Sequence, residues 1–430
     1  MAANLEAVED SQALKRKDWK IISLIGSAHA SSHFFQLVFP TLYLSLAHEY
    51  GYDFARLGLL ATVFFLVSCF GQASSGFVVD RIGPAPVLRF GLACFVLSGV
   101  LIATSSGYTM LLLAAAIGGI GNSVFHPVDY SIINHRVSQQ RLGHAFSTHG
   151  LTGNLGWALT PVFMATLIYL ANWRVAAFGA SALVALVLFF TWLGRDLLAG
   201  KNNAVAQTAN ADTGASSQTD LSQQTVGQTL ATLLVQPALW GAFLFFAFTS
   251  MALSAVQNYT IPMLGDVYGI DKVLAGTTLS GYMIAAAVGM LAGGFLVGAT
   301  PNTERTVAIS LLLAGGLLVV LAIGGVPPSF AMVLVGLAGF CSGVSAPSRD
   351  MLIRRVTPKG ATGTVYGLVY SGMDVGSSLA PVGFGLMLDA GFTQGPWFGA
   401  AVGFVLAAGL AVLVAKAASR SVLPATPVRA

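Results

Sequence analysis

The sequence has few charged residues. Asp, Glu, Lys and Arg make up 9% of the 430 residues, 55% of the residues are apolar, and the mean hydropathy is +0.76. A typical soluble globular domain carries about 25% charged residues. This shortage of charge excludes a soluble globular protein and predicts an integral membrane protein, whose partners include the lipid bilayer and no nucleic acid.

Cysteine and catalytic signatures are also scarce. The three cysteines, Cys69, Cys94 and Cys341, fall inside apolar runs, and an odd number at such positions argues against a disulfide framework. No Gly-Lys-Ser/Thr follows the glycine-rich stretches, which excludes a phosphate loop and an ATP-driven pump. No nucleophile, base and orienting group can be recognised together. We therefore expect no enzyme activity, no cofactor and no metal site.

Long apolar runs are abundant. A membrane-spanning helix needs about 20 apolar residues, no run alternates with period two as barrel strands do, and no signal-peptide cleavage site follows the first run. The sequence therefore predicts an all-α membrane protein with twelve transmembrane helices, at 21–47, 57–79, 86–105, 109–133, 145–170, 174–193, 236–263, 273–298, 305–323, 329–352, 364–388 and 396–417.

The positive charges predict the orientation. With the N-terminus in the cytoplasm, 18 of the 21 Lys and Arg residues fall on the cytoplasmic side, and only Arg56, Arg174 and Lys272 fall outside. Cytoplasmic loops carry such an excess of Lys and Arg. We therefore expect both termini in the cytoplasm. We also expect the chain to lie in the inner membrane of a bacterial cell, as a monomer.

The two halves of the chain repeat. At an offset of 220 residues Gly119 matches Gly339, Pro127 matches Pro347 and Pro161 matches Pro381, among other positions. The polar stretch between the halves lacks apolar periodicity and predicts a flexible linker. The expected parts are a cytoplasmic tail (1–20), a six-helix bundle (21–196), the linker (197–230), a second, pseudo-symmetric six-helix bundle (231–418) and a C-terminal tail (419–430). Duplicated bundles are typical of transporters with alternating access.

The stretch GFVVDRIGPAPVL, residues 76–88, resembles the G-x-x-x-D-R-x-G signature of the major facilitator superfamily through Gly76, Asp80, Arg81 and Gly83. The stretches HFFQLVFPTLY, GLLATVFFLVSCFGQASSGF and GNSVFHPVDY are most similar to its fosmidomycin-resistance-like branch. The resemblance implies a secondary transporter and a gating role for the four signature residues. The basic residues that usually follow Gly83 are absent, and helix 5 lacks the Gly-Pro pair of drug antiporters, so direction and substrate stay open.

Two histidines one turn apart, His29 and His33, lie inside the first apolar run, and His126 falls at a similar depth in the fourth. An ionisable side chain at that depth costs on the order of 2.5 kcal/mol or more, so it needs a reason. One interpretation is that the three imidazoles bind an anion or exchange a proton. The alternative is that they are neutral packing groups, in which case the His126 ring only satisfies a carbonyl freed by Pro127.

Other polar residues at membrane depth are candidates for substrate or proton binding. Gln36 lies in the first helix, and its repeat counterpart Asn258, followed by Tyr259, lies in the equivalent helix of the second half. These side chains either bind the solute or form plain hydrogen bonds between helices. Asn154 and Asp374 occupy equivalent places in the fifth and eleventh helices. Asp374 is the candidate proton carrier of the second half, unless it is a buried structural acid.

Asp129 and Arg349 each lie two residues after an equivalent proline, near the expected cytoplasmic ends of helices 4 and 10. They are candidates for a gating ion pair, and snorkelling to the membrane surface is the alternative. The basic cluster Arg354, Arg355 and Lys359 is typical of topology and lipid contact.

These observations favour a secondary active transporter for a small, anionic organic solute, coupled to protons. A drug/proton antiporter that exports toxic compounds is the first alternative. A membrane sensor with a transporter fold is an alternative of another class.

Overall fold

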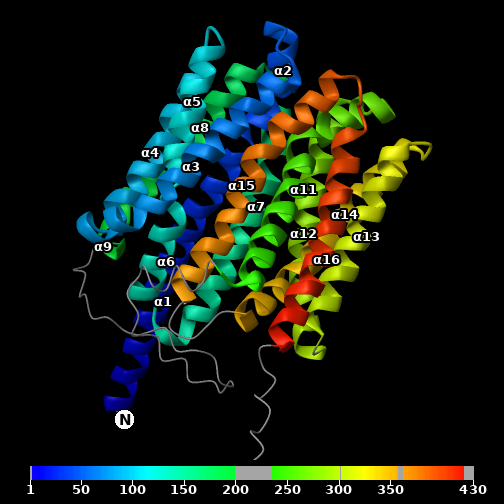
Figure 1. Ribbon diagram of the computed structural model, residues 1–430. Helices are drawn as coiled ribbons and strands as arrows, with labels where there is room; N and C mark the ends of the chain where they lie inside the picture. The colour runs from blue at the N-terminus through cyan, green and yellow to red at the C-terminus, as the bar shows by residue number, and fades with distance from the viewer. Residues whose placement is uncertain (1, 199–234, 301, 357–361, 421–430) are drawn as a thin grey trace, which may run out of the picture. The chain divides into compact units, whose positions relative to one another are not determined.

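The computed structural model describes residues 2–198, 235–300, 302–356 and 362–420, and within these ranges all regular structure is helical (Figure 1). The helices are α1 (Ala2–Gln36), α2 (Val38–Tyr50), α3 (Phe54–Ile82), α4 (Pro84–Ala103), α5 (Tyr108–Asn122), α6 (Phe125–Arg136), the 3₁₀ turn η1 (Gln139–Arg141), α7 (Leu142–Leu170), α8 (Trp173–Leu193), α9 (Arg195–Leu198), α11 (Pro237–Tyr268), α12 (Lys272–Ala299), α13 (Thr303–Ile323), α14 (Pro328–Val356), α15 (Thr362–Asp389) and α16 (Gly395–Arg420).

The twelve predicted spans are confirmed by this helix pattern. Each coincides with one helix, except that α1 and α2 together form the first span and α5 and α6 the fourth. Ten stretches of the described chain are long and apolar enough to cross a membrane by length and composition. The first span, which is divided between α1 and α2, and α15 are not among these ten stretches.

The two interrupted spans break close to a proline. Pro40 lacks an N–H for the carbonyl of Gln36, and α1 ends at Gln36. Pro127 likewise leaves the carbonyl of Ser123 without its helical donor, between the end of α5 and the start of α6. A proline also clashes with the residue four positions earlier, which breaks the helix there. The sequence predicted continuous spans, and the structure divides both.

A side-chain hydroxyl occupies one of the backbone acceptors that these breaks expose. The Oγ of Ser75 donates to the freed carbonyl of Ser123 at 3.1 Å. Because that carbonyl already has a donor, His126 is not needed to satisfy it. Irregular backbone at membrane depth is tolerated where protein or a water-filled cavity supplies partners, and broken helices commonly form transporter binding sites.

The chain forms two compact units. The first comprises residues 1–203, 257–284 and 381–393, and the second comprises residues 204–256, 285–380 and 394–430. Parts of α11, α12 and α15 thus belong to the first unit, where the Tyr43 hydroxyl donates to Asn258 at 2.9 Å and the N–H groups of Phe54 and Ala55 donate to the Asp389 carboxylate at 2.8 and 2.7 Å. The predicted linker, 197–230, lies almost entirely outside the described residues, and the boundaries of the two bundles stay a prediction.

Helices α1 and α7 cross at very close range. A Cβ on Gly156 would lie 2.3 Å from the backbone oxygen of Ala30, a separation that only glycine permits. One turn away, a Cβ on Gly153 would lie 3.0 Å from ring atoms of both His29 and His33. Glycine at these two positions therefore brings α7 against the histidine-bearing face of α1.

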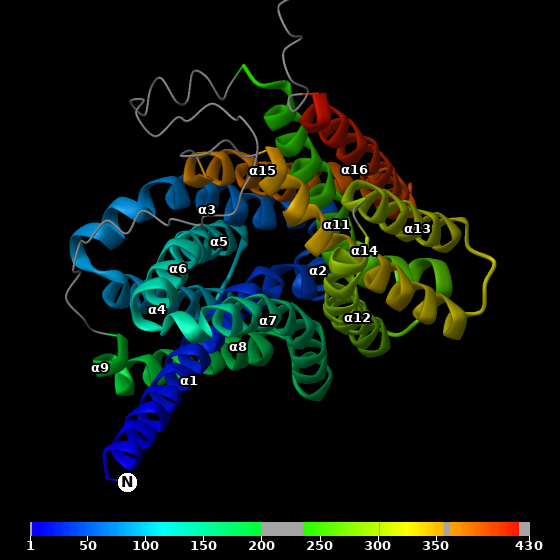
Figure 2. The ribbon, with the colours of Figure 1, turned by 90° about the horizontal axis from the view of Figure 1, so that it is seen from below.

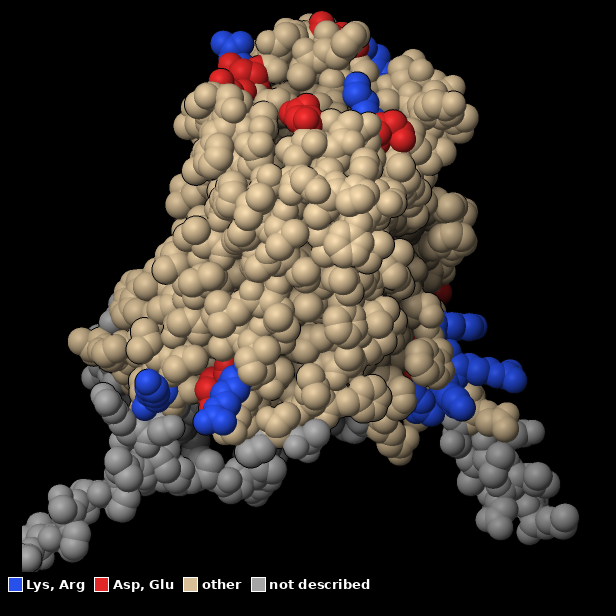
Figure 3. Space-filling model, turned by 90° about the vertical axis from the view of Figure 1, so that its right-hand side faces the viewer, with Lys and Arg blue, Asp and Glu red and all other residues tan. Residues whose placement is uncertain are grey.

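Charged side chains gather toward two ends of the face seen in Figure 3, and a wide band between them carries neither Lys, Arg, Asp nor Glu. Such a band matches the hydrocarbon region of a bilayer, where a charge is costly. The chain is a multi-pass membrane protein.

Candidate functional site

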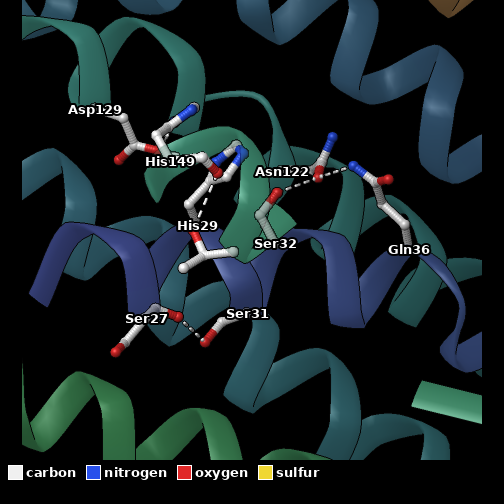
Figure 4. A network of polar contacts seen from close by, with 9 residues as sticks. Ser27, His29, Ser31, Ser32, Gln36, Asn122, Asp129 and His149 are labelled. Atoms are coloured by element: carbon white, nitrogen blue, oxygen red, sulfur yellow. Dashed lines mark hydrogen bonds and ion pairs between the residues drawn. The ribbon is translucent and has the colours of Figure 1, made fainter. Parts of the chain in front are cut away.

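Asp129 of α6 lies at the centre of a histidine cluster in the first unit. Its side chain is fully buried, and its Oδ2 accepts hydrogen bonds from His29 Nδ1 of α1 at 3.0 Å and from His149 Nε2 of α7 at 3.1 Å (Figure 4). The rings of His29 and His149 stack with centroids 3.5 Å apart. Residues of α1, α6 and α7 therefore meet at one carboxylate.

Two further histidines surround this centre. The His33 ring lies 4.5 Å from the His29 ring, and the His126 ring lies 5.6 Å from it, centroid to centroid. The predicted convergence of the three imidazoles of His29, His33 and His126 is therefore confirmed by the distances. The side chain of His126 is exposed and that of His33 is half-buried, whereas those of His29 and His149 are buried. We call His29, His33, His126, His149 and Asp129 the histidine cluster.

An amide network continues from the histidine cluster along α1. The Oδ1 of Asn122 accepts from Ser32 Oγ at 2.8 Å and from Gln36 Nε2 at 3.0 Å, and its Nδ2 donates to Ser68 Oγ at 2.8 Å. Trp157 Nε1 donates to Gln36 Oε1 at 2.9 Å. Gln36 and Asn122 are the last residues of α1 and α5, so both amides lie where a proline has interrupted a span.

Trp157 also connects the network with the cluster. Its ring lies 4.2 Å from that of His33, centroid to centroid, while its indole nitrogen holds Gln36. A continuous set of polar side chains thus runs through the first unit, contributed by α1, α3, α5, α6 and α7.

Two buried atoms of the histidine cluster have no hydrogen-bond partner among the described residues. They are the second carboxylate oxygen of Asp129, Oδ1, and the ring nitrogen Nδ1 of His33. Leaving a buried polar atom unpaired costs about 1–3 kcal/mol, so such atoms need an explanation. One unpaired acceptor and one unpaired ring nitrogen give the cluster spare capacity for a proton and for a polar ligand.

Three of the histidines come close enough to share a metal ion. One ring nitrogen from each of His29, His126 and His149 lies within 4.8 Å of the others. The nitrogens of His29 and His149 that face Asp129 are already engaged in hydrogen bonds with it. The other ring nitrogen of each of these two imidazoles takes no part in these hydrogen bonds, and a carboxylate on the far nitrogen also orients metal-ligating histidines, so the contact with Asp129 does not exclude a metal ion.

The other candidate residues of the first unit lie in different surroundings. The side chain of Asn154 donates to the carbonyl of Gly150 on its own helix at 3.0 Å. Asn258 accepts from Tyr43, and the Tyr259 hydroxyl donates to the carbonyl of Pro381. Their role in binding stays a prediction.

In the second unit, the backbone carbonyl of Asp374 accepts from Ser378 Oγ at 2.6 Å, and its side chain is half-buried. Arg349 Nε donates to Asp350 at 2.9 Å, and its guanidinium lies over the Phe246 ring at 5.0 Å. In the first unit, the side chain of Asp129 is fully buried and bonded to two histidines, so it does not snorkel to the membrane surface. The gating pair of Asp129 and Arg349 stays a prediction.

The structure describes the surroundings of two of the four signature residues, Arg81 and Gly83. Gly83 ends α3 and precedes α4 with φ +87°, a conformation that favours glycine, and Pro84 then begins α4. Arg81 is exposed. The surroundings of Gly76 and Asp80 are not among those that the structure describes, and the same holds for Arg354, Arg355 and Lys359.

Sequence reasoning missed several residues of the site. His149, Asn122, Ser32 and Trp157 were not among the candidates, and Asp129 was assigned only to a gate. A signal for His149 exists, because it lies at i, i+4 and i+7 with Gly153 and Gly156, on the face that packs against α1.

Comparison with known proteins gives the class of this molecule. The family model of the Major Facilitator Superfamily matches residues 24–381 and 244–429. The fosmidomycin resistance protein of Escherichia coli K12 is 28% identical over 65% of this chain, and the alignment spans 65% of that relative's length. A probable L-galactonate transporter of the same organism is 22% identical, in an alignment that spans 89% of this chain and 85% of that relative's length. The membrane sensor protein UhpC, also from that organism, is 24% identical over 83% of this chain and 82% of its own.

A solved structure shows the same fold. The crystal structure of a bacterial homologue of the human lysosomal transporter Spinster, in an inward-facing conformation, aligns with a TM-score of 0.72 and 15% identity over 94% of this chain and 98% of that chain. The fold and the matches define a membrane transporter and not an enzyme. The chain belongs to the Major Facilitator Superfamily.

Proposed function

We propose that this protein is a secondary active transporter that moves a small organic anion across the inner membrane by alternating access, coupled to protons that the histidine cluster binds. The observation that carries the proposal is a pair of buried atoms inside a group of four histidines, Asp129 Oδ1 and His33 Nδ1, which have no hydrogen-bond partner in the described part of the chain. A cluster with free hydrogen-bonding capacity is suited to a ligand that arrives and leaves.

The charge of the cluster changes with its protonation. With Asp129 ionised and all four histidines neutral, the cluster carries one negative charge and repels an anion. Each proton that the cluster binds adds one positive charge, so two added protons reverse the sign. One unit charge at about 5 Å contributes roughly 3 kcal/mol at an effective dielectric constant of about 20, which corresponds to roughly 100-fold in affinity. Proton loading and anion binding therefore favour each other.

The amide network supplies the neutral part of the site. Gln36 and Asn122 lie at helix breaks, and Trp157 connects Gln36 with His33. Amide and indole groups orient hydroxyl and carboxylate groups without adding charge. The similarity to a probable L-galactonate transporter supports a hydroxylated carboxylate as the solute class.

The test is solute uptake by the purified protein in proteoliposomes under an imposed pH gradient. A panel of sugar acids, aromatic carboxylates, phosphonates and a lipophilic cationic dye separates the charge classes. We expect at least one anion to accumulate in response to the gradient, and the dye not to. His29→Gln should abolish the response. The matched control is His135→Gln, since His135 is exposed on α6 and, among the described residues, its ring nitrogen bonds to the Ser131 carbonyl of its own helix.

Two outcomes would replace the proposal. Gradient-driven movement of the dye alone would establish the drug/proton antiporter that exports toxic compounds. Binding of an anion without any movement across the membrane would favour a membrane sensor, which is the function given in the name of the relative UhpC.

A further inference from the structure

A groove of about 940 Å³ lies on the first unit, away from the histidine cluster, where the N-terminal part of α1 passes α8 and α9. Three cations of α1 line it: Lys15, Arg16 and Lys20. Its remaining wall is largely apolar, with Leu24 from α1 and Leu186 and Phe190 from α8. Figure 2 shows α1 beside α8 and α9 along this stretch.

The cations and the apolar wall lie at different depths. Lys15 precedes Leu24 by nine residues, which is about 13 Å along a helix that rises 1.5 Å per residue. Trp19, 39% exposed, stands between them, as tryptophans do at a membrane surface. With the N-terminus in the cytoplasm, as the Lys and Arg distribution predicts, the cations are at headgroup level and Leu24 is at the start of the hydrocarbon.

A buried acid fixes the rotation of this part of α1. Asp18 is fully buried and accepts from Ser138 Oγ at 2.6 Å and from Arg141 at 3.0 Å. Residues three or four positions apart share a face of a helix. Because Asp18 is bonded to Ser138 and to Arg141 of η1, this part of α1 is not free to turn, and Arg16 and Lys20, which lie four residues apart, are held on the side of the groove.

We propose that this groove binds one anionic phospholipid of the cytoplasmic leaflet, with its phosphate among Lys15, Arg16 and Lys20 and an acyl chain along Leu24, Leu186 and Phe190. Apolar side chains cover any membrane helix, so the wall by itself selects nothing. The three cations select negative charge, as basic pockets between helices on this side of a membrane do. A soluble phosphate would use the cations and leave the apolar wall uncovered.

The occupant would act on the transporter through α1. The same helix carries the groove cations and, about two and a half to five turns further on, His29 and His33. A lipid that joins α1 to α8 and α9 would hold the helix that positions the histidine cluster.

The test is native mass spectrometry of the purified full-length protein titrated with phosphatidylglycerol, with phosphatidylcholine as the zwitterionic lipid and glycerol 3-phosphate as the soluble headgroup. We expect one tight phosphatidylglycerol and no comparable binding of the other two. Each cation near the headgroup contributes about 1 kcal/mol, a factor of about five, so Arg16→Gln/Lys20→Gln should weaken binding roughly 25-fold.

The matched control is Lys17→Gln/Lys416→Gln, which removes two other positive charges, Lys17 being exposed on α1 but not part of the groove lining. It should bind like wild type. Leu186→Trp should fill the apolar wall and weaken binding with all three cations in place. Equal binding of phosphatidylcholine, equal binding by Arg16→Gln/Lys20→Gln and wild type, or binding of glycerol 3-phosphate as tight as that of the lipid would overturn the proposal.

Discussion

His29 and His33 are one turn apart on α1, yet their surroundings differ. His29 donates to the buried carboxylate of Asp129, whereas Nδ1 of His33 has no partner among the described side chains. Removing one partner of a buried hydrogen-bonded charge leaves the other unsatisfied, which is costly, while removing an unpaired group is not. The two residues should therefore separate folding from binding.

We expect His33→Gln to lower anion affinity by about tenfold or more, the value of one hydrogen bond to a charged group, with little change in melting temperature. His29→Gln should lower both affinity and melting temperature. Ligand binding between pH 6 and pH 8 and thermal unfolding in detergent measure the two effects. Wild type should bind anions more tightly at pH 6 than at pH 8, with a flatter dependence in either variant. Identical behaviour of both variants and wild type would show that the histidines only pack.

Glu49 at the end of α2 gives a second pH-dependent test. Hydrogen bonds from Trp173 and Arg174 lower the pKa of the Glu49 carboxyl below its ordinary value of 4.5. A carboxyl with a depressed pKa in the folded state adds stability above its unfolded pKa and loses it as the pH falls through the folded value. The loss therefore occurs below about pH 4.5.

We expect the melting temperature of wild type to drop below pH 4.5 more steeply than that of Glu49→Gln. The effect should be small, because both side chains of the Glu49–Arg174 pair are 37% exposed and solvent screens them. Asp196→Asn is the control, since Asp196 is 93% exposed in its pair with Arg195. Parallel curves for Glu49→Gln and wild type would contradict the assignment.

The meeting of His29, His33 and His126 was predictable, because helical spacing and rise per residue fix which residues share a face and a depth. The partners of that group were not. Whether Asp129 turns inward or snorkels depends on the rotation of α6, which tertiary packing sets. His149 came into reach because Gly153 and Gly156 let α7 approach α1, a contact that sequence spacing alone does not specify.

At the level of helices, the α1–α7 crossing is the contact that shapes the site. A methyl group on Gly156 would meet the backbone of Ala30, which cannot move aside as a flexible side chain can. Overpacking typically costs 1–3 kcal/mol. Gly150, six residues earlier on α7, has open space where a Cβ would lie.

Gly156→Ala should therefore lower the melting temperature and the anion affinity together, by separating α7 from α1. Gly150→Ala, the matched change in the same helix, should leave both close to wild type. Thermal unfolding of the two variants in detergent checks the stability, and ligand titration checks the site. Equal melting temperatures would mean that the crossing is looser than described.

The helix breaks show a second limit of the sequence analysis. The runs 21–47 and 109–133 predicted two continuous spans, and their position was right. The prolines that divide them, Pro40 and Pro127, act four residues upstream, at Gln36 and Ser123. Both prolines can be read from the sequence. A proline in a membrane helix does not always break the helix, however, because neighbouring groups can supply partners for the freed carbonyl.

At the scale of the whole molecule, transport requires the two halves to alternate between states. The repeat in the sequence predicts this motion, and the resemblance of residues 76–88 to the superfamily signature implies a gate at Asp80. We expect Asp80→Asn to shift the population toward the inward-open state, slowing transport while leaving ligand binding intact. Transport rates and binding measured on the same preparation test this, and a wild-type rate in the variant would remove Asp80 from the gate.

The central claim is that Asp129 and its histidines couple protons to the anion. The most direct measurement compares counterflow exchange of the solute with accumulation driven by a pH gradient, in proteoliposomes containing wild type or Asp129→Asn. Asparagine keeps the shape and can still accept hydrogen bonds, but it cannot release a proton. The account predicts that exchange continues and accumulation is lost. Accumulation at the wild-type level would contradict it and would leave Asp374, in the second unit, as the candidate proton carrier.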